Sequence, residues 1–295
     1  MDDKHLYGVV PALLTPLNRD GSLDTARLEK LIEYQLAAGV HGIFVAGMTG
    51  EGALLDDGLL RALIAQSSRI IHGRVPLCAG ALRPDTEAVI ATAHAVSDAG
   101  ADMLAATVPT NRTVSQAEII AHFEAICQGT RLPWMVYGNS GAFTNIEPQT
   151  MMALAQIDDV VAIKDTRPDY EGCLKNIIAL RGSGATHLCG GEYLVGPGLL
   201  FGSDGNISGA TNLFPELFVR LYDATRSVDL PAVRAAAEKI ARIHTAAAQT
   251  GAWLAAFKHI GTRMGLMQPF CVAGQPTLTE AGRRSLDAFM DTMEG

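Results

Sequence analysis

The sequence has no apolar segment long enough to cross a membrane. None of its apolar stretches reaches the roughly 18 residues that a membrane-spanning helix requires. The amino terminus, from Met1 to His5, is charged and leads directly into a strand-like run, so no secretory signal peptide is expected. These absences predict a cytoplasmic protein with no membrane partner.

Cysteine is sparse, and its spacing excludes several structural classes. The five cysteines are an odd number, are scattered along the chain and include no C-x-x-C pair. The eight histidines show neither an H-E-x-x-H motif nor any other ligand spacing. We therefore expect reduced thiols, no disulfide framework, no metal site and no cofactor.

Basic residues are outnumbered by acidic ones. The chain has 23 Lys and Arg against 31 Asp and Glu, which leaves a formal net charge of -8 and argues against nucleic acid as a partner. No G-K-[ST] follows its glycine-rich loop, so a nucleotide phosphate is not expected there. With 48% hydrophobic and 18% charged residues, the chain reads as a packed globular protein.

Short apolar runs alternate with amphipathic helical stretches along most of the chain. Strands are expected at residues 9–14, 42–46, 75–79, 103–107, 133–137, 160–164, 187–189 and 205–208. Helices are expected between them, for example at 24–38, 57–71, 85–99 and 116–128. Eight such units predict a (β/α)8 TIM barrel. The alternative, an open doubly wound sheet, would normally carry a G-x-G-x-x-G turn after its first strand, and this turn is absent.

Helix boundaries and the carboxyl-terminal region follow from the same patterns. Asp24 and Asp85 stand where helix N-caps belong, and Gly39 and Gly100 stand where helices end. The tail is alanine-rich and lacks strand signals, with helices expected at 230–248, 253–264 and 280–293. We therefore expect a barrel catalytic domain at 1–227 and a helical extension at 228–295.

Lys164 ends one of the predicted strands, at the position where such a barrel carries its chemistry. The preceding run, residues 160–163, is β-branched and apolar, which favours a buried strand. An ammonium group is costly to bury, and burial favours the free amine that a Schiff-base nucleophile requires. The alternative is a structural lysine that pairs with Asp165 or another carboxylate.

A glycine-rich loop follows the second predicted strand. It reads Gly47-Met48-Thr49-Gly50-Glu51-Gly52. Backbone N–H groups of such a loop can converge on an anion such as a carboxylate, and the Thr49 hydroxyl can donate to the same anion or relay a proton. A plain tight turn is the alternative interpretation.

Tyr137 ends the fifth predicted strand, next to the strand of Lys164. A phenol in this position can transfer protons during imine formation and carbon–carbon cleavage. A core tyrosine with a hydrogen-bonded hydroxyl is the alternative.

Taken together, these motifs resemble the dihydrodipicolinate synthase / N-acetylneuraminate lyase family of class I aldolases. The loop Gly47-Met48-Thr49-Gly50-Glu51 is similar to the family's G-[TS]-T-G-E segment, and Ile163-Lys164-Asp165-Thr166 is similar to its Schiff-base segment. The resemblance extends over nearly the whole chain. It implies a (β/α)8 barrel with a helical extension that assembles as a homo-oligomer, a tetramer or a dimer.

The resemblance also implies roles for particular residues. Lys164 would form a Schiff base with pyruvate or another 2-oxo acid, and Tyr137 would be the proton-relay phenol. Thr49 and the adjacent amides would hold the substrate carboxylate. The substrate-binding positions implied in this way are Gly47, Met48, Gly50, Asn111, Gly190, Glu192, Ile207 and Ser208.

Some positions differ from the best-known branches of that family. Met48 stands where many members have a relay hydroxyl, Asn111 where the synthase branch has a tyrosine, and Ala142 where that branch has an arginine. The segment Gly190-Gly191-Glu192-Tyr193 departs from the Gly-Tyr-Asp-Glu of the sialic-acid lyase branch. The segments Lys164-Asp165-Thr166 and Cys189-Gly190-Gly191-Glu192 look more like those of the branch that acts on 2-oxo-3-deoxy sugar acids.

The sequence therefore favours a lyase that cleaves a 2-oxo-3-deoxy sugar acid to pyruvate and an aldehyde. Three alternatives stay open. The same lysine could serve a dehydratase of a 2-oxo-3-deoxy acid or a dihydrodipicolinate synthase-type condensation. The chain could also be a non-catalytic protein that binds a 2-oxo acid, an alternative motivated by Met48 and Asn111.

Overall fold

The computed structural model describes residues 6–138 and 144–294. The charged start of the chain and Ala142, with the arginine comparison made for it, lie outside these ranges. Within these two ranges the chain forms eight strands and eleven α-helices.

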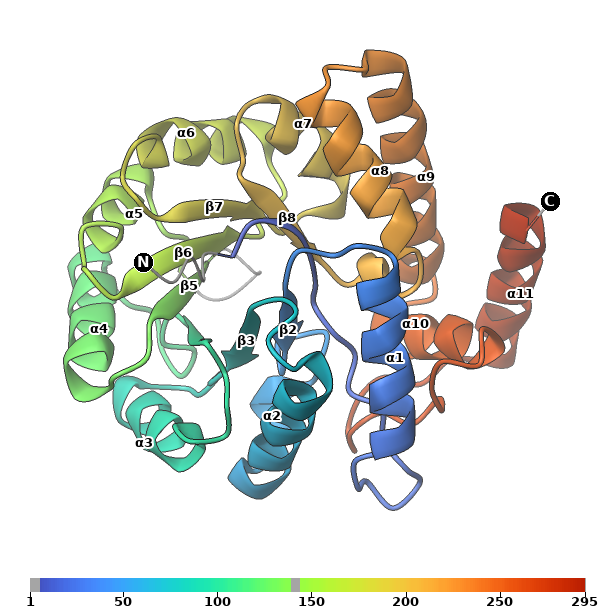
Figure 1. Ribbon diagram of the computed structural model, residues 1–295, viewed down its shortest axis with the longest axis horizontal. Helices are drawn as coiled ribbons and strands as arrows, with labels where there is room; N and C mark the ends of the chain where they lie inside the picture. Colours follow the sequence, from blue (N-terminus) through green and yellow to red (C-terminus); the bar gives the residue numbers. More distant parts are fainter. Residues whose placement is uncertain (1–5, 139–143, 295) are drawn as a thin grey trace.

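Eight parallel strands form one sheet that curves into a barrel (Figure 1). The strands are β1 (Gly8–Pro11), β2 (Ile43–Val45), β3 (Leu77–Gly80), β4 (Met103–Thr107), β5 (Trp134–Gly138), β6 (Val160–Asp165), β7 (Thr186–Cys189) and β8 (Gly205–Ser208). Their hydrogen-bonded order is β1-β8-β7-β6-β5-β4-β3-β2. Just beyond β1, Ala12 forms a parallel bridge with Phe44, and the Leu13 amide donates to the Phe44 carbonyl at 2.7 Å. This bridge joins the two edge strands, so the predicted (β/α)8 barrel is confirmed.

Helices follow the strands and surround them (Figure 1). They are α1 (Thr25–Ala37), α2 (Asp57–Ile71), α3 (Thr86–Val96), α4 (Gln116–Gly129), α5 (Pro148–Leu154), α6 (Tyr170–Leu180), α7 (Val195–Leu200) and α8 (Pro215–Arg226). Three 3₁₀ turns, η1 (Gly52–Leu54), η2 (Glu192–Leu194) and η3 (Ala210–Asn212), lie in the loops after β2, β7 and β8. These loops lie at the carboxyl ends of the strands, the face that carries the chemistry in barrels of this type.

The predicted helix starts are confirmed, and one predicted helix end is wrong. Asp24 accepts a hydrogen bond from the Arg27 amide, and Asp85 accepts one from the Ala88 amide, as N-caps do. Helix α3, however, ends at Val96 rather than at residue 99. Ser97 and Ala99 donate to the carbonyls of the preceding turn, so the chain leaves the helix before it reaches Gly100.

The carboxyl-terminal helices are α9 (Leu230–Ala248), α10 (Trp253–Arg263) and α11 (Glu280–Glu294). Helix α9 packs against α8 and α10, and α11 packs against α10 (Figure 1). The expected absence of strands from this region agrees with the structure of its described residues. No helix in the described ranges is both long and apolar enough to span a membrane.

The barrel encloses a core of its own, separate from the layer between strands and helices. Alternate residues of each strand point inward, and the interior residues that form one cluster are Leu6, Val10, Ala12, Phe44, Cys78, Leu82, Met103, Ala105, Met135, Tyr137, Ala162, Leu188 and Ile207. Two positions after Ala162 on the same strand, Lys164 also points inward. The lysine therefore stands above an apolar floor.

Asn212 joins the start of the barrel to its end. Its side-chain Oδ1 accepts from the Leu14 amide at 2.9 Å, and its Nδ2 donates to the carbonyls of Ala12 and Gly209 at 2.7 and 2.8 Å.

We expect Asn212→Ala to lower the free energy of unfolding by about 2–4 kcal/mol, because it leaves these buried backbone groups without partners. Urea denaturation measures this loss. The exposed Asn18, changed to Ala, should cost about 1 kcal/mol or less, and an equal loss for both variants would contradict the prediction.

Candidate active site

Lys164 lies near the carboxyl end of β6, inside the barrel and almost fully buried, with 3% of its surface exposed. The register of the sheet pairs it with Tyr137 on β5. Its Nζ lies 3.8 Å from the centre of the Tyr137 ring and 5.4 Å from the centre of the Phe44 ring. The two rings themselves meet edge to face, with centroids 6.2 Å apart. Aromatic faces stabilise a cation without binding it as a carboxylate would, so they leave the amine available for chemistry.

Asp165 does not serve as the counter-ion that a structural lysine would need. Adjacent residues of a strand point to opposite faces, so Asp165 points out of the barrel while Lys164 points in. The Asp165 carboxylate accepts from Asn176 Nδ2 at 2.7 Å and lies 3.7 Å from Nε of Arg167. The structure therefore argues against pairing between Lys164 and its neighbour in sequence.

Cys78 on β3 lies in the apolar floor of the barrel, where its thiol interacts electrostatically with Lys164. Burial raises the pKa of the Cys78 thiol far above its usual range, an effect that the nearby Lys164 charge only partly offsets. The thiol stays neutral, and it neither neutralises the lysine nor competes with it as a nucleophile.

The loop at 47–52 follows β2 and is held in a compact turn. The amides of Glu51 and Gly52 donate to the carbonyls of Met48 and Gly47 at 3.1 and 3.0 Å. In the described part of the chain, the amides of Thr49 and Gly50 donate to no backbone carbonyl, which leaves them available to an anion. A Cβ on Gly52 would come within 1.8 Å of the Ala46 carbonyl oxygen, so this position requires glycine.

Strain and bracing mark the same loop. Ala46, directly before the loop, and Glu51, within it, have φ values of 54° and 60°, a conformation that residues with a side chain seldom adopt. Thr15, four residues after the end of β1, donates its hydroxyl proton to the Gly50 carbonyl at 2.6 Å. Thr49 itself is buried, with 7% of its surface exposed, and its hydroxyl lies close to Gly209 after β8. The loop thus packs against the segments that follow β1 and β8.

A buried ion pair ties this loop to the carboxyl-terminal region. Glu51 Oε2 and Lys258 Nζ lie 2.5 Å apart, and both side chains are fully buried. Lys258, on α10, also donates to the carbonyls of Thr15 and Phe270, and the Val272 amide donates to the other Glu51 oxygen at 2.6 Å. The helical extension therefore holds the loop that carries Thr49 through its contacts with Glu51.

The remaining predicted binding residues lie in different surroundings. Ile207 is fully buried in the barrel interior, and a Cβ on Gly190 would come within 2.2 Å of Thr166 Oγ1. Ser208 donates to Glu192 Oε1 at 3.2 Å, and Glu192 Oε2 lies 3.6 Å from His244 Nδ1 on α9. These three polar side chains form a group beside the ends of β7 and β8.

Two predicted binding positions are exposed and contact no other predicted site residue through a hydrogen bond. Met48 has 45% of its surface exposed. Asn111 is exposed and its amide donates weakly to Asp85 at 3.4 Å. The structure therefore brings Lys164 and Tyr137 into contact, holds the Thr49 loop at the same end of the barrel, and leaves Met48 and Asn111 at the surface.

A cleft of about 640 Å³ lies elsewhere, between the loop 17–21 and the segment 269–278. Arg19 stacks on Phe270 in its wall at 5.6 Å. Lys164, Tyr137 and Thr49 do not line it, so its volume says nothing about the candidate site.

Three residues that hold the site in place were not predicted from the sequence. Phe44, which forms the second aromatic wall of Lys164, was read only as part of a strand. Glu51 was quoted within the loop motif but given no role, although an acid among glycines was a signal that it binds something. Lys258 gave no signal, because its partner lies 207 positions away in the sequence.

Comparisons with known proteins agree with this architecture. The model of the dihydrodipicolinate synthetase family matches residues 5–292. A 4-hydroxy-tetrahydrodipicolinate synthase of Xanthomonas campestris pv. campestris is 33% identical over 247 residues, which cover 81% of this chain and 80% of that protein. A protein of the same name from Shewanella pealeana is 30% identical over 244 residues, 80% of each chain.

Solved structures show the same fold. Dihydrodipicolinate synthase from Bacteroides thetaiotaomicron superposes with a TM-score of 0.91 at 28% identity and covers 97% of this chain and 98% of that chain. A prophage protein of the dihydrodipicolinic acid synthase family from E. coli K12, solved in complex with pyruvate, gives a TM-score of 0.92 at 24% identity, with 98% and 99% coverage.

Proposed function

Because the chain belongs to the dihydrodipicolinate synthetase family, whose members are class I lysine Schiff-base enzymes, we propose that it is a lyase. Its substrate would be a 2-oxo-3-deoxy sugar acid, which it would cleave to pyruvate and an aldehyde without a cofactor. The family assignment supports the 2-oxo acid and the aldehyde, and the sugar acid is our own proposal.

The observation that carries the proposal is the environment of Lys164. Its amine is buried at the end of a barrel strand, contacts two aromatic rings and has its neighbouring carboxylate turned to the opposite face. A buried amine of this kind is suited to attack a carbonyl carbon. The Thr49 and Gly50 amides at the same end of the barrel are suited to hold the carboxylate of a 2-oxo acid.

In the proposed reaction, the Lys164 amine adds to the C2 carbonyl, one proton is taken from solvent and water leaves, which gives a protonated imine. Tyr137, directly or through a water, then accepts the proton of the C4 hydroxyl as its own phenolic proton passes to solvent. The C3–C4 bond breaks and the aldehyde leaves. The electron pair of the broken bond stays on C3 and forms an enamine with the pyruvate part. Protonation at C3 and hydrolysis of the imine release pyruvate and restore the free lysine.

The sugar-acid substrate is supported by the polar group beside β7 and β8. Glu192, Ser208 and His244 together offer one carboxylate, one hydroxyl and one imidazole, which suit the hydroxyl groups of a sugar chain. Met48 and Asn111 lack the hydroxyls that members of the synthase branch carry there. The relay would then depend on water or on substrate hydroxyls.

The test is pyruvate release from a panel of 2-oxo-3-deoxy acids that differ in length and stereochemistry. The lyase predicts equal amounts of pyruvate and aldehyde for at least one of them. A dehydratase would consume the acid and release a product that keeps all its carbon atoms. Binding of the acids without turnover by folded protein would indicate the non-catalytic alternative and overturn the proposal.

A second candidate is a condensation of the dihydrodipicolinate synthase type on the same lysine. The curated relatives that are 30–33% identical to this chain carry the name 4-hydroxy-tetrahydrodipicolinate synthase. Incubation with pyruvate and the aldehyde substrate of that enzyme distinguishes the two, because only the condensation consumes both compounds together.

Tyr137→Phe is expected to separate imine formation from turnover. Loss of a proton-transfer group lowers rates by about 10²–10⁴-fold, whereas the phenyl ring keeps the contact with Lys164. We therefore expect a fall in kcat of that size, with little change in the borohydride-trapped pyruvate adduct. An unchanged kcat would exclude Tyr137 as the relay. Tyr170→Phe, at an exposed position on α6, is the matched control.

We further propose that the barrel, residues 1–227, and the helical extension, residues 228–295, act as one catalytic unit in the cytoplasm. The assembly is proposed to be a homotetramer or homodimer. A monomeric dihydrodipicolinate synthase variant stands among the structural neighbours, at 24% identity, so light scattering of the purified chain is the measurement that decides its own state.

A further inference from the structure

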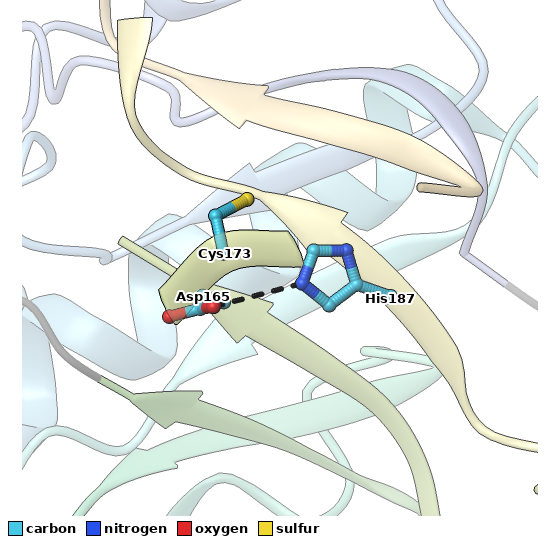
Figure 2. A group of neighbouring side chains, drawn as sticks. All are labelled: Asp165, Cys173 and His187. Carbon is cyan, nitrogen blue, oxygen red and sulfur yellow. Dashed lines mark ion pairs between the residues drawn. The ribbon is translucent and has the colours of Figure 1, made fainter. Parts of the chain in front are cut away.

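Three side chains of types that can bind a metal meet on the outer face of the barrel, away from the Lys164 side. They are Asp165 of β6, Cys173 of α6 and His187 of β7 (Figure 2). One ligand atom from each lies within 4.8 Å of the others, and all three residues are buried. They stand 8 and 14 positions apart in the sequence, a spacing that matches no metal-binding motif, which is why the sequence predicted no metal site.

His187 turns the Nε2 atom of its ring toward this group. Its Nδ1 lies 3.0 Å from the Ser203 hydroxyl, which lies 2.8 Å from the Gly205 carbonyl and 3.0 Å from the His187 carbonyl. A hydroxyl that gives its one proton to a carbonyl can accept from an Nδ1–H group. An imidazole that donates through Nδ1 in this way has its lone pair on Nε2, the form that binds a metal.

That lone pair faces the Asp165 carboxylate. His187 Nε2 is buried, has no hydrogen-bond partner among the described residues and lies 3.7 Å from Asp165 Oδ2 (Figure 2). An N–H···O hydrogen bond would bring these atoms to about 2.7–3.2 Å. Two ligands of one zinc ion stand about 3–4 Å apart, since each lies about 2.0–2.3 Å from the metal. The observed separation fits a shared cation better than a shared proton.

The third candidate ligand is the sulfur of Cys173, which is buried and lies within 4.8 Å of the other two ligand atoms. Cys173 belongs to a small buried cluster that also contains Cys189, so a second sulfur stands close by. A cysteine binds metal as the thiolate, and a bound zinc ion itself favours loss of the thiol proton.

We propose that Asp165, Cys173 and His187 bind a divalent zinc ion. Thiolate, imidazole and carboxylate together are a ligand set that suits Zn²⁺ rather than Mg²⁺ or Ca²⁺, which prefer oxygen alone. The thiolate and the carboxylate balance the two charges of the ion. Cys189 or a water would complete a tetrahedral site.

The surrounding residues orient the ligands. Asn176 donates to Asp165 Oδ2 at 2.7 Å, Arg167 Nε lies 3.7 Å from Oδ1, and Ser203 holds the His187 ring. Side chains that bind a metal typically have such additional hydrogen bonds, which fix their orientation. The site also joins β6 directly after Lys164 to β7, so the ion would stabilise the strand ends that carry the candidate active site. It would not touch the substrate.

The test uses the full chain produced with zinc in the medium and dialysed against a weak chelator. Elemental analysis is expected to find about one zinc per chain in the wild type. Cys173→Ser and His187→Gln are each expected to lower the zinc content at least about tenfold. Cys127→Ser, at a buried thiol on α4, is the matched control and should keep its zinc.

Cobalt substitution tests the ligands in the wild type, independently of whether the variants fold. Protein refolded with Co²⁺ is expected to show a thiolate-to-cobalt charge-transfer band, which Cys127→Ser keeps. Absence of that band, together with less than about a tenth of a zinc per chain, would overturn the proposal. Zinc content that survives both ligand substitutions in folded protein would also overturn it.

Discussion

Replacing Lys164 by arginine is expected to abolish turnover and imine formation together. Arginine keeps the positive charge but does not deprotonate in proteins, so it cannot attack a carbonyl. We expect kcat/KM to fall by at least about a thousandfold, because the covalent route is lost rather than weakened. Treatment with pyruvate and borohydride, followed by peptide mass analysis, should label wild-type Lys164 and nothing at position 164 of the variant.

The controls separate the chemistry from folding. Lys175→Arg changes an exposed lysine on α6 whose partner is Glu171, and it should leave both activity and labelling intact. Lys164→Met removes the charge as well and should be equally inactive, with a thermal transition similar to that of the arginine variant. Activity of Lys164→Arg within tenfold of the wild type, or pyruvate labelling of a different lysine, would refute the Schiff-base assignment.

Lys258→Met is expected to lower the free energy of unfolding by about 3–5 kcal/mol. It would leave the Glu51 carboxylate fully buried and without its ion-pair partner. It would also remove the donor to the carbonyls of Thr15 and Phe270. Guanidinium denaturation followed by circular dichroism measures this loss.

A double-mutant cycle shows whether the loss belongs to the pair. Glu51→Gln and Lys258→Met together are expected to cost less than the sum of the two single changes, because the second removes the charge that the first leaves unpaired. The surviving folded protein should show a raised KM for its 2-oxo acid substrate, since the loop of Thr49 and Gly50 loses its support. Additive effects, or a single loss below about 1 kcal/mol, would contradict the coupling.

The exposed pair Arg234–Glu238 on α9 supplies the matched comparison. Both of its side chains are in solvent, where an ion pair contributes little. Arg234→Met should leave the unfolding midpoint within experimental error. The contrast with Lys258→Met would show that burial, rather than the presence of an ion pair, sets the size of the effect.

Much of the barrel could be predicted from local patterns. Alternation of apolar runs with amphipathic segments identified all eight strands, although the first was expected to run to residue 14 and ends at Pro11. Beyond it the chain still pairs with β2, but through one bridge rather than a ladder. The N-caps Asp24 and Asp85 were predicted because a cap bonds within its own first turn.

The candidate site divides in the same way. Lys164 and Tyr137 could be expected side by side, because each ends a strand and consecutive strands of such a barrel are neighbours. That Lys164 meets the face of the Tyr137 ring, with Phe44 as a second wall, depends on side-chain packing across three strands. No pattern in the sequence indicates such a contact.

By itself, the sequence determined the order of strands and helices, the face on which Lys164 stands and the family resemblance, because these depend on short-range periodicity and contiguous motifs. Only the tertiary structure decided that Asp165 meets His187 and Cys173 on the outer face, and that Glu51 pairs with Lys258. These contacts join residues of different strands and helices, and their energies arise from burial that exists only once the barrel and its helical extension are packed together.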